Sequence, residues 1–199
     1  MAYPTVSGPY GLKPINLVGG QVFAGATRQM PIASGYDTNL LNGDLVKLIS
    51  DGTVEKDAGT TTATPVGVFL GCRYTDPSLG YELYSQYFPA NTAADDIVAY
   101  VADDPDQLYK VAVVSGTTVV AGVGRTVVGN NVSLVQNAGS TATGNSKVAV
   151  LSTSAATTNT LPVRVIDVVA ETATAADTYV ELVVKFNWGM HQYQNSTGV

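Results

Sequence analysis

The sequence has few of the residue types that build most reactive sites. It contains 1 cysteine and 1 histidine among 199 residues. A single cysteine excludes an intramolecular disulfide and a multi-cysteine metal cluster. The one histidine, His191, provides a single imidazole for acid–base chemistry and excludes a histidine-rich metal site. We therefore predict no catalytic residue, no bound metal and no cofactor, and expect that the chain is not an enzyme.

Charged side chains are also scarce. They make up 13% of the chain, about half the usual share of about 25%. The formal net charge of −6 argues against binding to a phosphate backbone. The longest apolar runs fall short of the ~18–20 residues that a membrane-spanning helix needs. We therefore expect neither a nucleic acid nor a membrane as partner. The first residues carry neither the basic start nor the apolar stretch of a secretory signal, so we expect folding in a cytoplasm.

What the chain does contain favours β-structure. Hydrophobic residues reach 45%, which is too many for a disordered chain. Valine and threonine, which pack well on a pleated sheet, are frequent, and 20 glycines supply turns. Turn signals recur about every 8–12 residues, a spacing typical of sandwiches and barrels. The sequence predicts an all-β fold: a glycine-rich β-sandwich or β-barrel with at most one or two short helices.

Two segments give the clearest strand signals. Asp51-Gly52 separates two short β-prone runs at residues 45–49 and 53–56, which predicts a hairpin. Near the C-terminus, apolar residues alternate strictly, which predicts a half-buried strand with Val180, Leu182, Val184 and Phe186 on its inner face. Further strands are expected at residues 65–74, 81–88, 97–101, 108–114 and 163–169. A short helix is allowed near residues 90–96, and a helical turn or loop at 171–177.

The ends of the chain differ from this β-rich domain, which we place at residues 36–187. Residues 1–35 are interrupted by prolines and glycines, so neither a helix nor a central strand fits them. Because apolar side chains recur there, we expect an extended N-terminal arm that buries them against its own domain or a neighbour. Residues 188–199 form a C-terminal tail that holds the only tryptophan and the only histidine.

The candidate reactive groups have simpler structural explanations. Cys72 lies in an apolar strand, where a lone cysteine usually behaves as a small buried hydrophobe. The glycines of residues 122–129 lack the Gly-Lys-Ser/Thr and the helix of a phosphate loop. An acidic cluster offers oxygen ligands for Ca²⁺ but lacks the spacing of a calcium loop, so solvated turns are favoured for Asp95, Asp96, Asp103, Asp104 and Asp106.

Three segments together carry a family resemblance. They are residues 3–14 (YPTVSGPYGLKP), residues 43–48 (GDLVKL) followed by 65–71 (PVGVFLG), and residues 179–187. In these segments the chain resembles structural proteins of tailed-bacteriophage virions, in particular those of cyanophages. The Gly-Asp strand followed by a Val-Gly-Val strand is similar to the small head decoration, or capsid cement, proteins. The long spine helix of the common major capsid fold is not encoded.

The resemblance implies a non-enzymatic capsid cement protein that binds across junctions between major capsid subunits and stabilises the head. Its partners would be the major capsid protein and further copies of itself, a homotrimer first and a homodimer second. Its location would be the capsid exterior of the virion, after assembly in the host cytoplasm. Interface candidates are the apolar and aromatic residues of both ends: Tyr3, Pro4, Tyr10, Leu12, Ile15, Leu17, Trp188, His191 and Tyr193.

Two alternatives remain open. The first is a tail, baseplate or fibre component of the virion. The second is a small carbohydrate-binding or hydrolytic β-sandwich that uses Tyr84, Tyr87, Trp188 and the acidic loop. We also expect that removal of residues 1–20 leaves a folded core.

Overall fold

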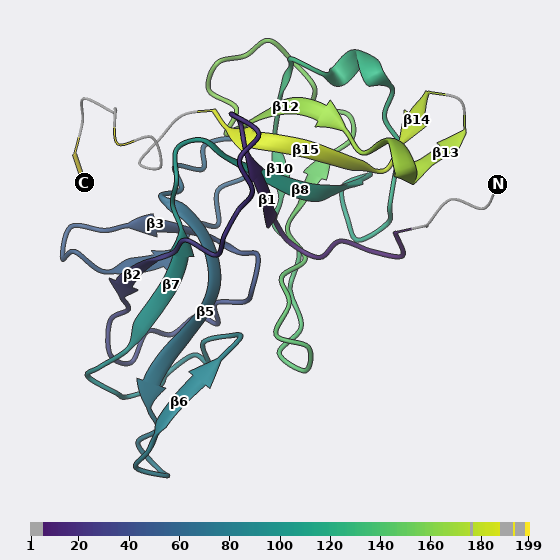
Figure 1. Ribbon diagram of the computed structural model, residues 1–199. Coiled ribbons are helices and arrows are strands. Elements are labelled where there is room, and N and C mark those ends of the chain that lie inside the picture. Colours follow the sequence, from purple (N-terminus) through teal and green to yellow (C-terminus); the bar gives the residue numbers. More distant parts are fainter. Residues whose placement is uncertain (1–5, 176, 188–192, 194–197) are drawn as a thin grey trace.

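The computed structural model describes residues 6–175, 177–187, 193 and 198–199 (Figure 1). Strands make up 41% of the structure and helices 3%, so the predicted all-β fold is confirmed. The helical residues described are two 3₁₀ turns, η1 (Arg125–Val127) and η2 (Ala170–Thr172). No described segment forms a helix able to cross a membrane.

Seven strands form a nearly closed, barrel-like sheet in the upper part of Figure 1. Six follow the order β10-β11-β8-β15-β12-β9, and β1 pairs with β8 beside this path. Valines dominate its interior, where the rings of Tyr109 and Phe186 pack with centroids 5.0 Å apart. The strands are β1 (Lys13–Leu17), β8 (Gln107–Val114), β9 (Asn131–Val132), β10 (Leu134–Val135), β11 (Ala149–Leu151), β12 (Val163–Val168) and β15 (Glu181–Phe186).

A second sheet of six strands lies beside the barrel-like sheet. Its order is β2-β7-β5-β3-β4, with β6 paired to the far end of β5. A separate core covers one face, built around Phe69 and Phe88. The strands are β2 (Arg28–Pro31), β3 (Leu45–Leu48), β4 (Val54–Lys56), β5 (Gly67–Thr75), β6 (Glu82–Ser85) and β7 (Val98–Ala102). A small two-stranded sheet joins β13 (Ala173–Ala175) to β14 (Thr178–Tyr179).

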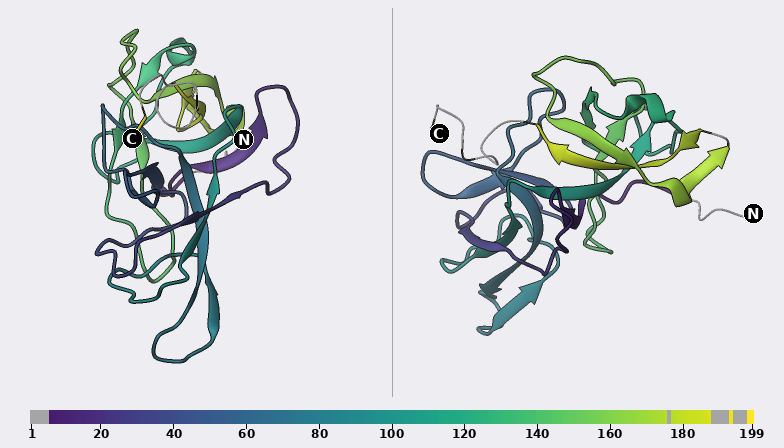
Figure 2. Two further views of the ribbon diagram at one scale, coloured as in Figure 1. Left: turned by 90° about the vertical axis from the view of Figure 1, so that its left-hand side faces the viewer. Right: turned by 45° about the horizontal axis from the view of Figure 1, so that its top comes forward.

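The two large sheets are packed together through the second face of the six-stranded sheet. Leu45, Val68 and Ala102 lie on strands of that sheet, yet belong to the core of the barrel-like sheet. On β5 the contact is made near the start of the strand, at Val68, and the strand is 9 residues long. Its far end continues past the barrel with β6, and the right-hand and left-hand views of Figure 2 show the hairpin projecting from the body. The fold therefore carries a β-hairpin, β5–β6, whose tip lies away from the barrel.

Residues 6–35 are built into both large sheets. β1 pairs with β8 of the barrel-like sheet, and β2 pairs with β7 of the second sheet. Both are edge strands, which explains why they tolerate Pro14 and Pro31: a proline in an edge strand removes no shared ladder hydrogen bond. From β1 onward this part of the chain contributes one strand to each large sheet.

Most sequence-predicted elements are present. β3 and β4 form the hairpin expected around Asp51-Gly52, and all four inner-face residues of the last strand are buried, as predicted for Leu182 and its neighbours. The helix allowed at residues 90–96 does not form, since Asn91 adopts a left-handed φ of 61° that interrupts any helix there. Residues 171–177 contain the end of η2 and strand β13.

Candidate interaction surfaces

Tyr10 connects the start of the chain to its last strand. Its hydroxyl donates a hydrogen bond to the carboxylate of Glu181 on β15, and that side chain is almost fully buried. The ammonium of Lys110 on β8 lies 3.7 Å from the same carboxylate oxygen. The ammonium groups of Lys13 and Lys110 lie 5.1 and 5.9 Å from the centre of the tyrosine ring. Burial and the neighbouring carboxylate raise the pKa of Tyr10.

The remaining N-terminal candidates divide into three groups. Leu12 is fully buried in the core of its own chain, so its assignment as an interface anchor is wrong. The backbone N–H of Gly11 donates to the carbonyl of Val148, and that of Leu12 donates to the carbonyl of Gly43. These bonds fix the backbone so that the Leu12 side chain points into the core. Ile15 and Leu17 on β1 are half-buried and keep part of their surface outside. Tyr3 and Pro4 lie outside the described residues.

One C-terminal candidate lies against the body of the protein. The Tyr193 hydroxyl donates a hydrogen bond of 2.5 Å to Asp103, between β7 and β8. Arg28 of β2 places its Nε 2.6 Å from the same carboxylate and its guanidinium 5.2 Å from the centre of the tyrosine ring. Burial and Asp103 raise the pKa of Tyr193. The residue keeps an exposed fraction of 48%. Trp188 and His191 lie outside the described residues.

The β5–β6 hairpin forms a more exposed surface. Leu79, Tyr81 and Tyr84 have exposed fractions of 59, 55 and 66%. Leu79 lies in the connecting turn, which Asp76 stabilises by accepting hydrogen bonds from the backbone N–H groups of residues 78 and 79. Tyr81 directly precedes β6, and Tyr84 lies on β6 opposite Arg73 of β5. We call Leu79, Tyr81 and Tyr84 the hairpin-tip surface.

The same hairpin has an ion pair, Arg73–Glu82, next to Tyr84. Across the sheet, Arg73 of β5 is in register with Tyr84 of β6 on one side and with Val98 of β7 on the other. The Arg73 guanidinium is held 2.8 Å from Glu82 by an ion pair, and this hydrogen bond raises the pKa of Arg73. Tyrosine and arginine are the residue types that most often dominate protein–protein binding energy. The surface is therefore suited to a protein partner.

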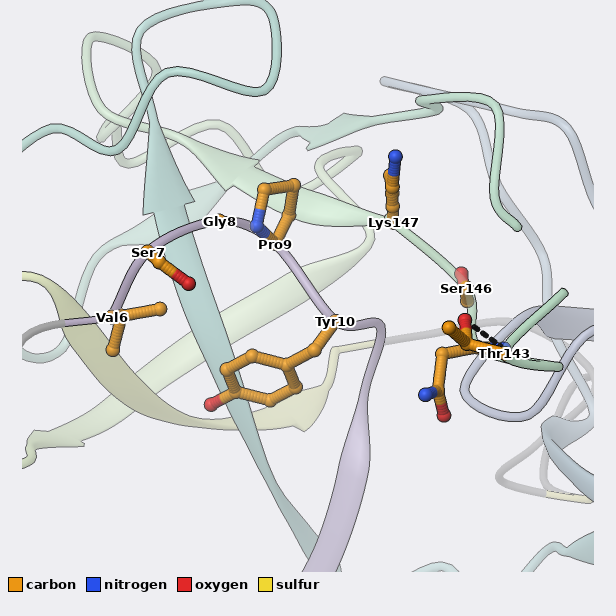
Figure 3. A pocket seen from close by; sticks show the side chains of 9 residues that line it. Val6, Ser7, Gly8, Pro9, Tyr10, Thr143, Ser146 and Lys147 are labelled. Carbon is orange, nitrogen blue, oxygen red and sulfur yellow. Dashed lines mark hydrogen bonds between the residues drawn. The ribbon is translucent and has the colours of Figure 1, made fainter.

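An open pocket lies between the N-terminal segment and residues 143–147 (Figure 3). It has a volume of about 440 Å³. Two of its hydroxyl groups already serve the fold: Ser146 donates to Asp44 at 2.6 Å, and Thr143 accepts from the N–H of Asn145 at 3.4 Å. In Figure 3 the Lys147 side chain points away from the other lining side chains. The geometry gathers no set of groups that would orient a small substrate.

Cys72, Asp96 and Asp103, which were considered as reactive or metal-binding groups, have structural roles. Burial raises the pKa of the Cys72 thiol to about 12, so it remains a protonated thiol at neutral pH. Asp96 accepts hydrogen bonds from Thr75, and Asp103 is paired with Arg28. Among the residues that the structure describes, no three acidic, histidine or cysteine side chains are grouped closely enough to hold a metal ion.

Two features of these surfaces could not be predicted from the sequence. The 81–88 segment was expected as a strand, and its first half forms β6, but alternation within it does not reveal that Tyr81 and Tyr84 lie beyond the barrel. The Tyr10–Glu181 hydrogen bond joins residues 171 positions apart, a distance over which a single sequence gives no pairing signal. Comparison with known proteins identifies no relative: no family model, curated protein or solved structure matches the chain.

Proposed function

We propose that the chain is a non-enzymatic structural protein of a phage virion, a capsid cement protein that binds across junctions between major capsid subunits. The observation that carries the proposal is the hairpin-tip surface, where Leu79, Tyr81 and Tyr84 are more than half exposed on a hairpin held by the second sheet. Large apolar side chains that stay exposed on a projecting hairpin are typical of protein contacts. The resemblance of the 43–48 and 65–71 segments to decoration proteins gives the class of partner.

The form of the hairpin supports this function. β6 pairs with β5, and its other edge has no partner strand among the described residues. An edge strand can add to a neighbouring sheet through main-chain hydrogen bonds. A cement protein that meets two capsid subunits at once gains from multivalent attachment, so each contact can be modest. Under this proposal three copies meet at a three-fold junction on the capsid exterior, and a dimer is the second choice.

The test is to count the chain in purified particles and then to weaken the hairpin tip. Quantitative mass spectrometry should find hundreds of copies per particle, whereas a tail, baseplate or fibre component would be present in tens or fewer. A protein absent from particles contradicts the proposal and leaves the carbohydrate-binding alternative, for which the melting temperature should rise with an added sugar.

The matched variants separate surface contacts from folding. The double substitution Leu79→Ser with Tyr84→Ser should leave thermal unfolding unchanged and reduce occupancy on shells that lack the protein. Val119→Ser is the control, because Val119 is 62% exposed in a loop of the barrel-like sheet. Equal shell occupancy for the double variant and the control would remove the hairpin tip from the binding surface.

A further inference from the structure

A second, smaller pocket lies under the loop that follows β1. It has a volume of about 200 Å³, and its walls are mainly apolar. The chain reverses after β1, with the N–H of Phe23 bonded to the carbonyl of Ile15 and the N–H of Val18 to the carbonyl of Asp106. This reversal places a short hairpin over the start of β8 and encloses the pocket. The lining residues are Leu17, Val22, Phe23, Ala24, Ala26, Asp104 and Gln107.

One wall of the pocket contains a buried side-chain amide, that of Gln107, whose hydrogen-bonding capacity is only partly used. Gln107 has no exposed surface. Its Nε2 donates hydrogen bonds to the carbonyls of Asn16 and Leu108, at 3.1 and 2.8 Å, which fixes the orientation of the amide. Its Oε1 is then a buried acceptor that has no partner within the described chain. A buried acceptor without a donor is destabilising, so a ligand that brings an N–H group gains binding energy by supplying one.

The second polar group of the pocket is a carboxylate. Asp104 is half-buried, and its Oδ1 accepts the N–H of Asp106 at 2.8 Å. No ion pair joins it to a basic side chain of the described chain, in contrast to its neighbour Asp103, which is paired with Arg28. The lining residues include no lysine or arginine. The pocket therefore combines apolar walls with two acceptors, one of them negatively charged.

We propose that this pocket receives the side chain of one arginine from a protein partner. A guanidinium group has several N–H donors in a planar fork, so it can serve Asp104 and Gln107 together. Its aliphatic stem fits apolar walls, and its plane stacks on an aromatic ring, here that of the half-buried Phe23. A lysine ammonium is more strongly hydrated and offers no plane to stack, so it fits these walls less well.

The chain itself contains a guanidinium in a similar setting next to this pocket. Arg28 is held by the carboxylate of Asp103 and by the ring of Tyr193, as described above. Asp104 and Ala26 line both that site and the pocket under the loop. Asp103 of the 103–106 turn thus binds an internal arginine, whereas Asp104 places a carboxylate without an ion-pair partner in the described chain next to apolar walls. The inference deepens the proposed function and rests on it only for the identity of the partner, a major capsid subunit.

The test is a titration of the full chain with three blocked amino acids, observed by NMR at the Gln107 side-chain amide. N-acetyl-arginine methylamide should bind saturably and shift this signal. The citrulline compound keeps the shape and loses the charge, so it should bind about tenfold more weakly. If the norleucine compound binds as tightly as the arginine compound, the pocket recognises only apolar surface and the inference is overturned. Failure of the arginine compound to bind would also overturn it.

Two variants locate the binding and separate this inference from the proposed function. Asp104→Asn should abolish the preference for arginine over citrulline, while Asp106→Asn, two residues away and outside the pocket, should keep it. If Asp104→Asn retains the preference, the inference fails. If the variant loses arginine binding but attaches to shells like the wild type, the pocket has no role in attachment and the proposed function stands. If the arginine compound binds but the chain is absent from particles, the proposed function fails and the pocket stands.

Discussion

The hydroxyl of Tyr10 donates a hydrogen bond to Glu181, so the chain's first described segment is fastened to its last strand. Glu181 is on the outer side of β15, opposite the buried face that contains Leu182. It is nevertheless almost fully buried, because the tyrosine ring covers it. This places a carboxylate under an aromatic cover with Lys110 as its charged neighbour. The N-terminal segment therefore acts as a structural cover of the barrel-like sheet.

Replacement of Tyr10 by phenylalanine should destabilise the protein by about 2 kcal/mol, because it removes a hydrogen bond to a charged, buried acceptor and keeps the ring. Urea unfolding at pH 7 measures the change. Tyr81→Phe is the matched control, since Tyr81 is 55% exposed and should change the free energy of unfolding little. Equal stability of the two variants would mean that Glu181 is satisfied by Lys110 alone.

Alkaline pH should weaken the fold. Burial raises the pKa of Tyr10, Tyr74 and Tyr109 above the ordinary value of 10.0. A phenol with a raised pKa in the folded state stays protonated there, while the unfolded chain loses its proton near pH 10. The stabilisation is thus complete below pH 10 and is lost as pH rises above it. Burial of the Cys72 thiol adds to the loss from its ordinary value of 9.0 upward.

Urea unfolding at a series of pH values between 8 and 11 tests this sign. The free energy of unfolding should fall with rising pH, and Tyr10→Phe should flatten the slope by at most one proton, about 1.4 kcal/mol per pH unit. Stability that rises through this interval would contradict the assigned burial of the phenols.

How far the sequence predicts the structure depends on the range of each signal. The period of two in residues 180–186 identifies the inner face of β15, and Asp51-Gly52 identifies a hairpin, because both signals act between near neighbours. The partition into two cores has no such local signal. Val68 and Phe69 are adjacent on β5 but belong to different cores, and an uninterrupted apolar run shows only that both faces are covered. Likewise, prolines and glycines made residues 1–35 resemble an arm, whereas Leu12 is fixed by distant backbone partners.

The candidate surfaces were less predictable than the fold. Solvent exposure of Leu79 and Tyr84 depends on how far β5 extends past the barrel, which is a property of the packing of two sheets. The pocket under the β1 loop depends on a chain reversal that brings residues 17–26 to Gln107. Neither the exposed hairpin nor the pocket can be predicted from the spacing of residues that are close in sequence.

Asp44 should be among the most sensitive polar positions. Its carboxylate has no exposed surface and accepts hydrogen bonds from the N–H of Leu41, the hydroxyl of Ser146 and the ammonium of Lys56, the last at 3.0 Å. Asp44→Asn leaves Lys56 without its counter-charge and places two donors of the amide next to existing donors. We expect a loss of about 3–5 kcal/mol, the range for a broken buried pair.

Glu55→Gln is the matched control for Asp44. It breaks the ion pair with Lys47, in which both side chains are about one-third exposed, so the loss should be below about 1 kcal/mol. Chemical denaturation of both variants measures the difference. Similar losses for the two would indicate that water reaches Asp44.

Removal of residues 1–20 should prevent stable folding, contrary to the expectation from composition. The deletion takes away β1, the fully buried Leu12 and the cover over Glu181. A buried leucine alone contributes about 2–5 kcal/mol, a large part of the stability of a domain. Circular dichroism and thermal unfolding of the truncated chain measure the effect. A cooperative transition at the wild-type temperature would show that the segment is dispensable to the fold.

A charge on the inner face of the last strand should be more damaging than the same charge on an outer face. Leu182 is 1% exposed and contacts the barrel core, so Leu182→Asp places an unpaired carboxylate among valines and removes apolar contacts. We expect a loss above about 4 kcal/mol and no cooperative unfolding transition. Ile166→Asp on the neighbouring strand β12 is the control, because Ile166 is 37% exposed. It should fold and melt within a few degrees of the wild type, and an equal effect of the two substitutions would contradict the inward direction of Leu182.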